Sequence, residues 1–150
     1  MRLIREGVFE TNSSSTHSLT MCTGSIFNDW KEGKVLFLED DCTFFVAGSL
    51  ELRDFFAKGV LTDKCSYNFD TKLYSDGTAT YTKEELFSRE RLDSVTEEEI
   101  RKYREEYWYE CPLTYSDWVD RYGEEYELFE QHKTFDGTEV VGFGYFGNDY

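Results

Sequence analysis

The sequence has few of the residues that interrupt or divide a fold. It holds a single proline, Pro112, and no tract rich in proline, glycine or serine that would act as a linker. Its apolar runs are far shorter than the about 18 residues that a membrane-spanning helix needs. Charges in residues 1–7 stand where a secretory signal needs an apolar run. These absences predict one cytoplasmic domain over residues 1–150, with no membrane partner.

Basic residues are also scarce. The chain has 16 Lys and Arg against 31 Asp and Glu, which gives a formal net charge of -15. Acid-rich chains with few aromatic residues stay disordered, but 13 Phe, 11 Tyr and 3 Trp give this chain enough apolar surface to fold. Such a charge repels nucleic acid and attracts basic protein surfaces. It therefore argues against direct nucleic-acid binding and favours a basic protein partner.

The pattern of apolar residues predicts the arrangement of strands. Short β-type runs separated by polar or glycine punctuation indicate strands over 2–9, 17–22, 34–39 and 43–47, so that the first third of the chain is expected to form a sheet. A further strand is expected over 66–73, followed by a turn over 75–78. Asp136-Gly137, between 126–135 and 139–146, is the strongest hairpin signal in the chain.

Helix signals are concentrated in the middle of the chain. Ser49 is placed to cap a helix over 50–58, with Gly59 as its stop. A short acidic helix is expected over 115–122, ended by Gly123. Two capping boxes mark further helix starts: Thr82 with Glu85, and Thr96 with Glu99. The predicted fold is a single α+β domain, a mostly antiparallel sheet with about three helices in the middle of the chain.

Acidic residues are denser in the second half of the chain. Residues 84–139 hold 18 Asp and Glu against 7 Lys and Arg. One interpretation is a solvated surface that keeps the protein soluble. The other is a binding face, in which carboxylates interleaved with Tyr and Trp imitate the spacing of phosphates and meet a row of Lys and Arg. The candidate partner-binding residues are Glu97, Glu98, Glu105, Glu106, Tyr107, Trp108, Asp117, Trp118, Asp120, Glu124 and Glu125.

Four cysteines form a second candidate site. Zinc takes four thiolate or imidazole ligands, and no C-x-x-C pair is present, so a site would have to be assembled by the tertiary fold. The other interpretation is that the cysteines fill the core. The candidate zinc ligands are Cys22, Cys42, Cys65 and Cys111, with His17 or His132 as a replacement.

A polar segment near the start forms the third candidate. Glu10, Ser13 to Ser15 and His17 contain the parts of a nucleophile, base and orienter set. Their alternatives are a polar connection between two strands and an anion-binding loop.

The opening residues Arg2-Leu-Ile-Arg-Glu-Gly-Val-Phe-Glu-Thr-Asn-Ser-Ser-Ser-Thr-His-Ser18 resemble the start of a group of small phage and prophage proteins. The acidic, aromatic-rich remainder with its scattered cysteines is similar in character to anti-CRISPR proteins, including a variety that holds zinc. This resemblance implies a non-enzymatic inhibitor of a basic, nucleic-acid-handling host protein, such as a type II CRISPR effector nuclease. It would block the loading of DNA or guide RNA. The alternatives are a small transferase or hydrolase with its site in residues 10–18, and a structural accessory protein.

Overall fold

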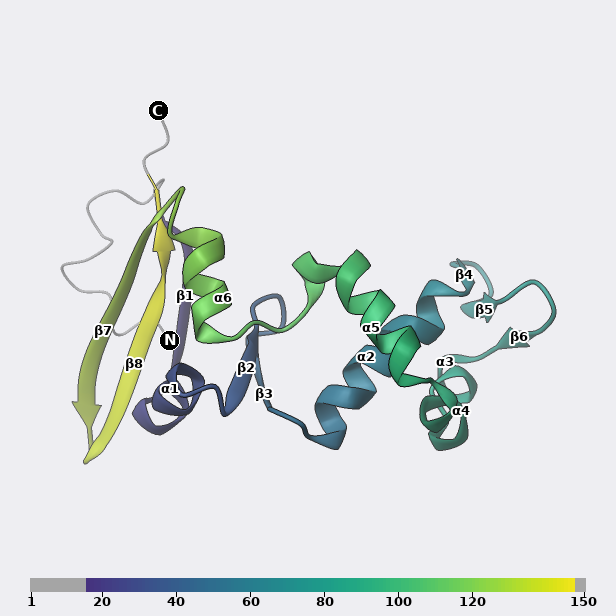
Figure 1. Cartoon of the computed structure of the whole chain (residues 1–150), viewed down its shortest axis with the longest axis horizontal. Coiled ribbons are helices and arrows are strands. Elements are labelled where there is room, and N and C mark those ends of the chain that lie inside the picture. Colours follow the sequence, from purple (N-terminus) through teal and green to yellow (C-terminus); the bar gives the residue numbers. More distant parts are fainter. Residues whose placement is uncertain (1–15, 148–150) are drawn as a thin grey trace. The chain divides into compact units, whose positions relative to one another are not determined.

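The computed structural model describes residues 16–147, which form an α+β fold with eight strands in three antiparallel sheets (Figure 1). The α+β class expected from the sequence is confirmed, with more helices than the three expected. The chain divides into two compact units. Among the described residues, unit 1 holds 16–47 and 112–147, and unit 2 holds Gly48–Cys111. The expectation of one domain stays a prediction.

Unit 1 is built on a three-stranded sheet in which β8 lies between β1 and β7. Asp136 and Gly137 have φ angles of 50° and 79° and form the two-residue turn from β7 to β8, as their hairpin signal predicts. A separate pair of antiparallel strands, β2 and β3, completes the unit. Its elements are β1 Thr16–Thr23, α1 Gly24–Lys31, β2 Val35–Leu38, β3 Thr43–Val46, α6 Tyr115–Tyr122, β7 Glu127–Phe135 and β8 Thr138–Phe146.

Helix α1 corrects the expectation that the first third of the chain is all sheet. The Thr23 hydroxyl accepts a hydrogen bond from the Ile26 amide at 3.3 Å and so caps the helix. Phe27 and Trp30 follow one turn apart, which places both on the same side of the helix. They are 1% and 0% exposed, and burial of these two rings stabilises a helix over this stretch.

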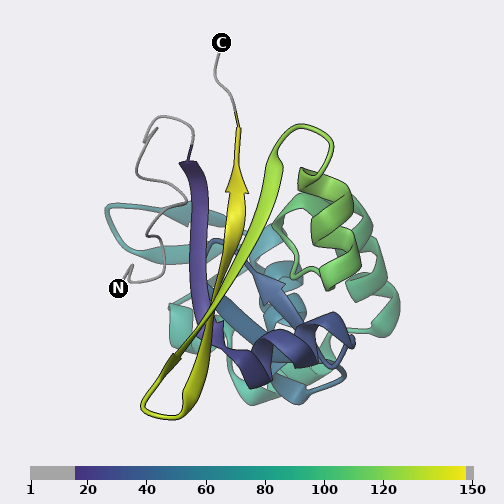
Figure 2. The ribbon, with the colours of Figure 1, turned by 90° about the vertical axis from the view of Figure 1, so that its left-hand side faces the viewer.

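The core of unit 1 is centred on Trp30. Its ring centroid lies 4.9 Å from that of Phe143 on β8 and 5.4 Å from that of Trp118 on α6. Its indole Nε1 donates a hydrogen bond to the Leu113 carbonyl at 3.0 Å. Leu113 also forms an antiparallel β-bridge with Phe37 of β2. Figure 2 shows α1 and α6 behind the sheet, on the same face. The aromatic residues of α6 are thereby directed into the core.

Unit 2 consists of helices and a small three-stranded sheet, with β5 between β4 and β6. Both capping boxes are confirmed, with the hydroxyl and the carboxylate each bonded to a backbone amide. Its buried residues include Phe56 and Leu61 of α2 and Ile100 of α5. The elements are α2 Leu50–Asp63, β4 Ser66–Asn68, β5 Leu73–Ser75, β6 Thr80–Tyr81, α3 Lys83–Leu86, α4 Arg89–Ser94, α5 Glu97–Glu106 and the 3₁₀ helix η3 Trp108–Glu110.

Two local expectations in unit 2 are wrong. Helix α2 does not stop at Gly59 but continues to Asp63, because the burial of Val60 and Leu61 stabilises one more helical turn. The single strand expected over 66–73 is a hairpin, because the Asn68 side chain accepts the amides of the next turn and reverses the chain. The strand expected over 2–9 lies outside the described residues.

Candidate functional site

The end of α5 and the turn after it carry two exposed aromatic side chains. Ile100 is buried within unit 2. The helix ends at Glu106, the backbone leaves helical geometry at Tyr107, and η3 begins at Trp108. Trp108 and Tyr109 are 58% and 55% exposed. Their rings meet edge to face with centroids 5.8 Å apart. Two large rings therefore face solvent where the helix has passed its last buried position.

Three exposed carboxylates adjoin these two rings in the sequence. We define the α5–η3 surface as Glu105, Glu106, Trp108, Tyr109 and Glu110. All five side chains are exposed. Glu105 accepts a hydrogen bond from Arg101 at 2.6 Å, whereas no basic side chain of the described residues forms an ion pair with Glu106 or Glu110. The surface combines apolar contact area with uncompensated negative charge.

The other carboxylates of α5 are largely compensated. The ion pairs are Arg101 with Glu98 and Glu105, Lys64 with Glu99, and Arg53 with Glu97. The hydrogen bond from Arg101 is the largest cause that lowers the pKa of Glu98. The hydrogen bond from Lys64 is the largest cause that lowers the pKa of Glu99. These carboxylates therefore contribute less to the external field than their number in the sequence suggests.

On helix α6 the aromatic candidate is buried, whereas the acidic candidates on and after the helix are exposed. Trp118 is 3% exposed and belongs to the core of unit 1, so it supplies packing and no longer belongs to the candidate binding face. The remaining candidates on and after the helix are exposed carboxylates that form no ion pair with any described basic side chain: Asp117, Asp120, Glu124 and Glu125. The candidate residues expected from the sequence thus fall on both units, 97–108 on unit 2 and 117–125 on unit 1.

The four cysteines are free thiols and also fall on both units. Cys22 lies in β1, and burial raises the pKa of its thiol to about 12, which disfavours the thiolate that zinc requires. Cys42 is exposed in the β2–β3 turn, Cys65 follows α2, and Cys111 follows η3. Within residues 16–147, no three Cys, His, Asp or Glu side chains form a metal-binding group. The zinc site stays a prediction.

The candidate catalytic segment is only partly described. Glu10 and Ser13 to Ser15 lie outside the described residues, and His17 lies in β1. The catalytic alternative therefore stays a prediction.

His132 on β7 lies between two carboxylates. Its Nε2 is 2.8 Å from Glu130 and its Nδ1 is 2.9 Å from Glu139 of β8. These two hydrogen bonds raise the pKa of His132 above its ordinary value. Because the carboxylates lie at opposite ring nitrogens, the three groups do not converge on one point. The two carboxylates form ion pairs with His132 only when the imidazole is protonated.

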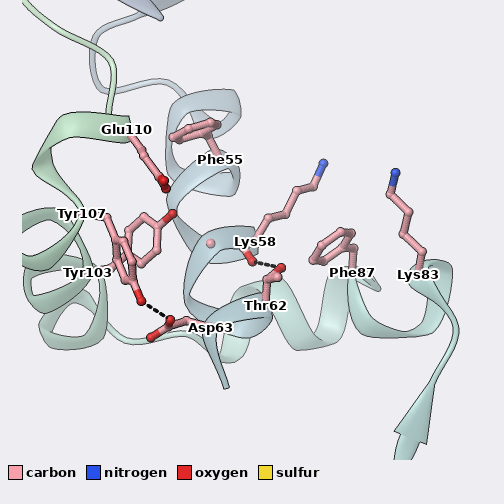
Figure 3. A pocket seen from close by; sticks show the side chains of 10 residues that line it. Phe55, Lys58, Thr62, Asp63, Lys83, Phe87, Tyr103, Tyr107 and Glu110 are labelled. Carbon is pink, nitrogen blue, oxygen red and sulfur yellow. Dashed lines mark hydrogen bonds between the residues drawn. The ribbon is translucent and has the colours of Figure 1, made fainter. Parts of the chain in front are cut away.

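A pocket of 510 Å³ lies over one face of α2, wholly within unit 2 (Figure 3). We call it the α2–α5 pocket. Gly59 forms part of its floor, and a Cβ there would lie 2.3 Å from Cζ of Tyr103, so the glycine is what lets that ring approach α2. Tyr107 donates a hydrogen bond to Asp63, and this bond, the largest cause, raises the pKa of Tyr107 to about 12.

The two sides of the pocket differ in charge. Tyr103, Tyr107 and Glu110 form one side in Figure 3, and Lys58 and Lys83 stand on the other. Sequence reasoning missed this pocket. Its signals were a glycine inside an apolar helix and two tyrosines four residues apart, which share one side of α5.

Comparison of the chain with protein-family models, with curated proteins and with solved structures finds no match. Among the described residues, no helix has both the length and the apolar character needed to cross a membrane.

Proposed function

We propose that this protein is a non-enzymatic, phage-type inhibitor that binds a basic, nucleic-acid-handling host protein. The α5–η3 surface is its contact site, and a type II CRISPR effector nuclease is the partner to test first. One observation carries the proposal: Trp108 and Tyr109 are more than half exposed beside three exposed carboxylates. Occupation of a basic channel by this surface would exclude DNA or guide RNA from it.

The two kinds of residue in the surface have different tasks. Large aromatic side chains that become buried at an interface supply most of the binding energy. Negative charges at the rim accelerate encounter with a positive surface and select against acidic partners. Water leaves Trp108 and Tyr109 when a partner covers them, whereas Glu105 and Glu106 keep contact with solvent. The formal net charge of -15 adds a long-range attraction toward a basic partner.

A double variant tests this proposal. Trp108→Ser with Tyr109→Ser should weaken binding to a type II effector nuclease by about 30-fold or more, since the loss of even one anchor of this kind costs roughly 2 kcal/mol. Loading of guide RNA and DNA should be restored in an electrophoretic assay. Phe69→Ser is the matched control, because Phe69 is 83% exposed at another place in unit 2. Equal binding by the double variant and the wild type would refute the proposed contact site.

A further inference from the structure

The acidic side of the α2–α5 pocket presents a pair of aromatic rings. The centroids of Tyr103 and Tyr107 lie 4.8 Å apart with an interplanar angle of 36°. Tyr107 is held in place by its hydrogen bond to Asp63, and Tyr103 lies against Gly59. Faces of tyrosine rings attract cations, and the planar guanidinium stacks on them better than an ammonium does.

Two carboxylates act on the same place. Burial raises the pKa of Tyr103, and among the negative groups that raise it further are Glu110 and Asp63. Asp63 and Glu110 also line the same pocket as Tyr103. Glu110 forms no ion pair within residues 16–147, so its oxygens are available as acceptors for a charged donor. A carboxylate beside an aromatic face offers a guanidinium both a charge-assisted hydrogen bond and a stacking surface.

The lysines on the other side restrict what enters. Lys58 holds its ammonium 5.6 Å from the centroid of the Phe87 ring. An anion bound between Lys58 and Lys83 would also face the negative field at Tyr103. A cation at Tyr103 would likewise face the positive field of the two lysines, so the faces of the Tyr103 and Tyr107 rings, which attract a cation and not an anion, are what favour the cation.

We infer that the acidic side of the α2–α5 pocket, formed by Asp63, Tyr103, Tyr107 and Glu110, binds an arginine side chain of the basic partner. This inference rests on the proposed function, because it concerns the same partner. It adds a second contact on unit 2, in which the partner inserts a side chain into this protein, whereas at η3 this protein inserts its rings into the partner.

The test uses the full chain and a small probe, so it does not depend on the nuclease. N-acetyl-arginine amide is titrated into ¹⁵N-labelled protein, and the backbone amides of unit 2 are followed. We expect saturable shifts at Gly59, Thr62 and Tyr103. Glu110→Gln should weaken binding of the probe about tenfold, as expected for loss of one charge-assisted hydrogen bond. N-acetyl-glutamate amide, the matched anionic probe, should produce no saturable shift at these positions.

Lys58→Gln with Lys83→Gln is the control that separates a cation site from an anion site. Under our inference these changes leave binding of the arginine probe unchanged or strengthen it. Loss of arginine binding in this variant, saturation by the glutamate probe, or full binding by Glu110→Gln would each overturn the inference. A protein that binds the arginine probe but not a type II effector nuclease would retain the pocket and refute the proposed partner, so the two failures are distinguishable.

Discussion

Helices α5 and α6 carry similar mixtures of aromatic and acidic residues but use them in opposite ways. In α6 the ring of Trp118 lies in the core, and the exposed carboxylates form no ion pairs with described residues. At the end of α5 and in η3, Trp108 and Tyr109 face solvent, and most helix carboxylates are paired with basic side chains. Among the described residues, one region has buried rings and unpaired carboxylates, and the other has exposed rings next to two unpaired carboxylates, Glu106 and Glu110, that follow a helix of mostly paired ones.

The difference comes from what each segment packs against. Helix α6 lies over the sheet of unit 1, where the rings of Trp30 and Phe143 take up its aromatic side. The segment η3 lies beyond the last buried residue of α5. A mixed aromatic and acidic sequence therefore does not define a binding face by itself. Only the position of the helix relative to a core decides which of its rings remain available to a partner.

Charge separates the two units as well. Within the described residues, unit 1 has 13 Asp and Glu against 4 Lys and Arg, and unit 2 has 15 against 10. Unit 1 is thus the stronger source of the negative field, although the candidate anchors lie on unit 2. Attraction over distance and tight contact need not come from the same surface.

The largest expected effect compares the two tryptophans directly. Trp118→Ala should lower the free energy of unfolding by about 3–5 kcal/mol, because it leaves a cavity in the core of unit 1. Trp108→Ala should change it by no more than about 0.5 kcal/mol, as is usual for an exposed side chain. Urea denaturation of both variants measures the contrast. Similar losses for the two variants would contradict the assignment of one ring to the core and the other to the surface.

Two glycines sharpen the comparison between the units. A Cβ on Gly144 would lie 2.1 Å from the Ser18 carbonyl oxygen, a backbone atom of the paired strand. Gly144→Ala should therefore destabilise the protein by about 1–3 kcal/mol. At Gly59 the obstacle is the far end of the Tyr103 side chain, which is able to move. Because alanine also favours the helix by up to about 1 kcal/mol, Gly59→Ala should cost much less than Gly144→Ala in thermal denaturation.

The smallest expected effect concerns pH. His132 is partly exposed and its pKa is raised by Glu130 and Glu139, so its contribution to stability is fully present below the unfolded value of about 6.5. That contribution is lost as the pH rises through the folded pKa. His132→Gln should remove a few tenths of a kcal/mol near pH 5 and about nothing near pH 9. A deficit in the variant that grows toward pH 9 would reverse the sign and refute this account.

Local signals in the sequence predicted much of the fold. Caps at Ser49, Thr82 and Thr96, and the Asp136-Gly137 turn, depend on residues within four positions of each other, and all were found. The end of α2 was missed because it depends on burial of Val60 and Leu61. Helix α1 was missed because its rings are stabilised by contacts with residues more than 80 positions away, such as Leu113.

The site was less predictable than the fold for the same reason. The acidic, aromatic-rich second half of the sequence made both Trp108 and Trp118 candidate binding residues, and only tertiary packing separates the exposed ring from the buried one. The number of acidic residues is plain from the sequence, but the number that are paired is not. Ion pairs such as Lys64 with Glu99 join residues 35 positions apart and cannot be predicted from local sequence. Long-range packing therefore determines which charges and rings are available for binding.

The most direct test of the central claim is the kinetics of binding to a type II effector nuclease at two salt concentrations. We expect Trp108→Ser to raise the dissociation rate about tenfold or more with little change in the association rate. Glu105→Lys with Glu106→Lys, and Glu124→Lys with Glu125→Lys, should slow association at low salt, and both effects should shrink toward ~0.5 M salt, where the screening length is a few ångströms. If Trp108→Ser left dissociation unchanged while the Glu124 and Glu125 reversal raised it, the contact would lie in the segment after α6, and the central claim would be wrong.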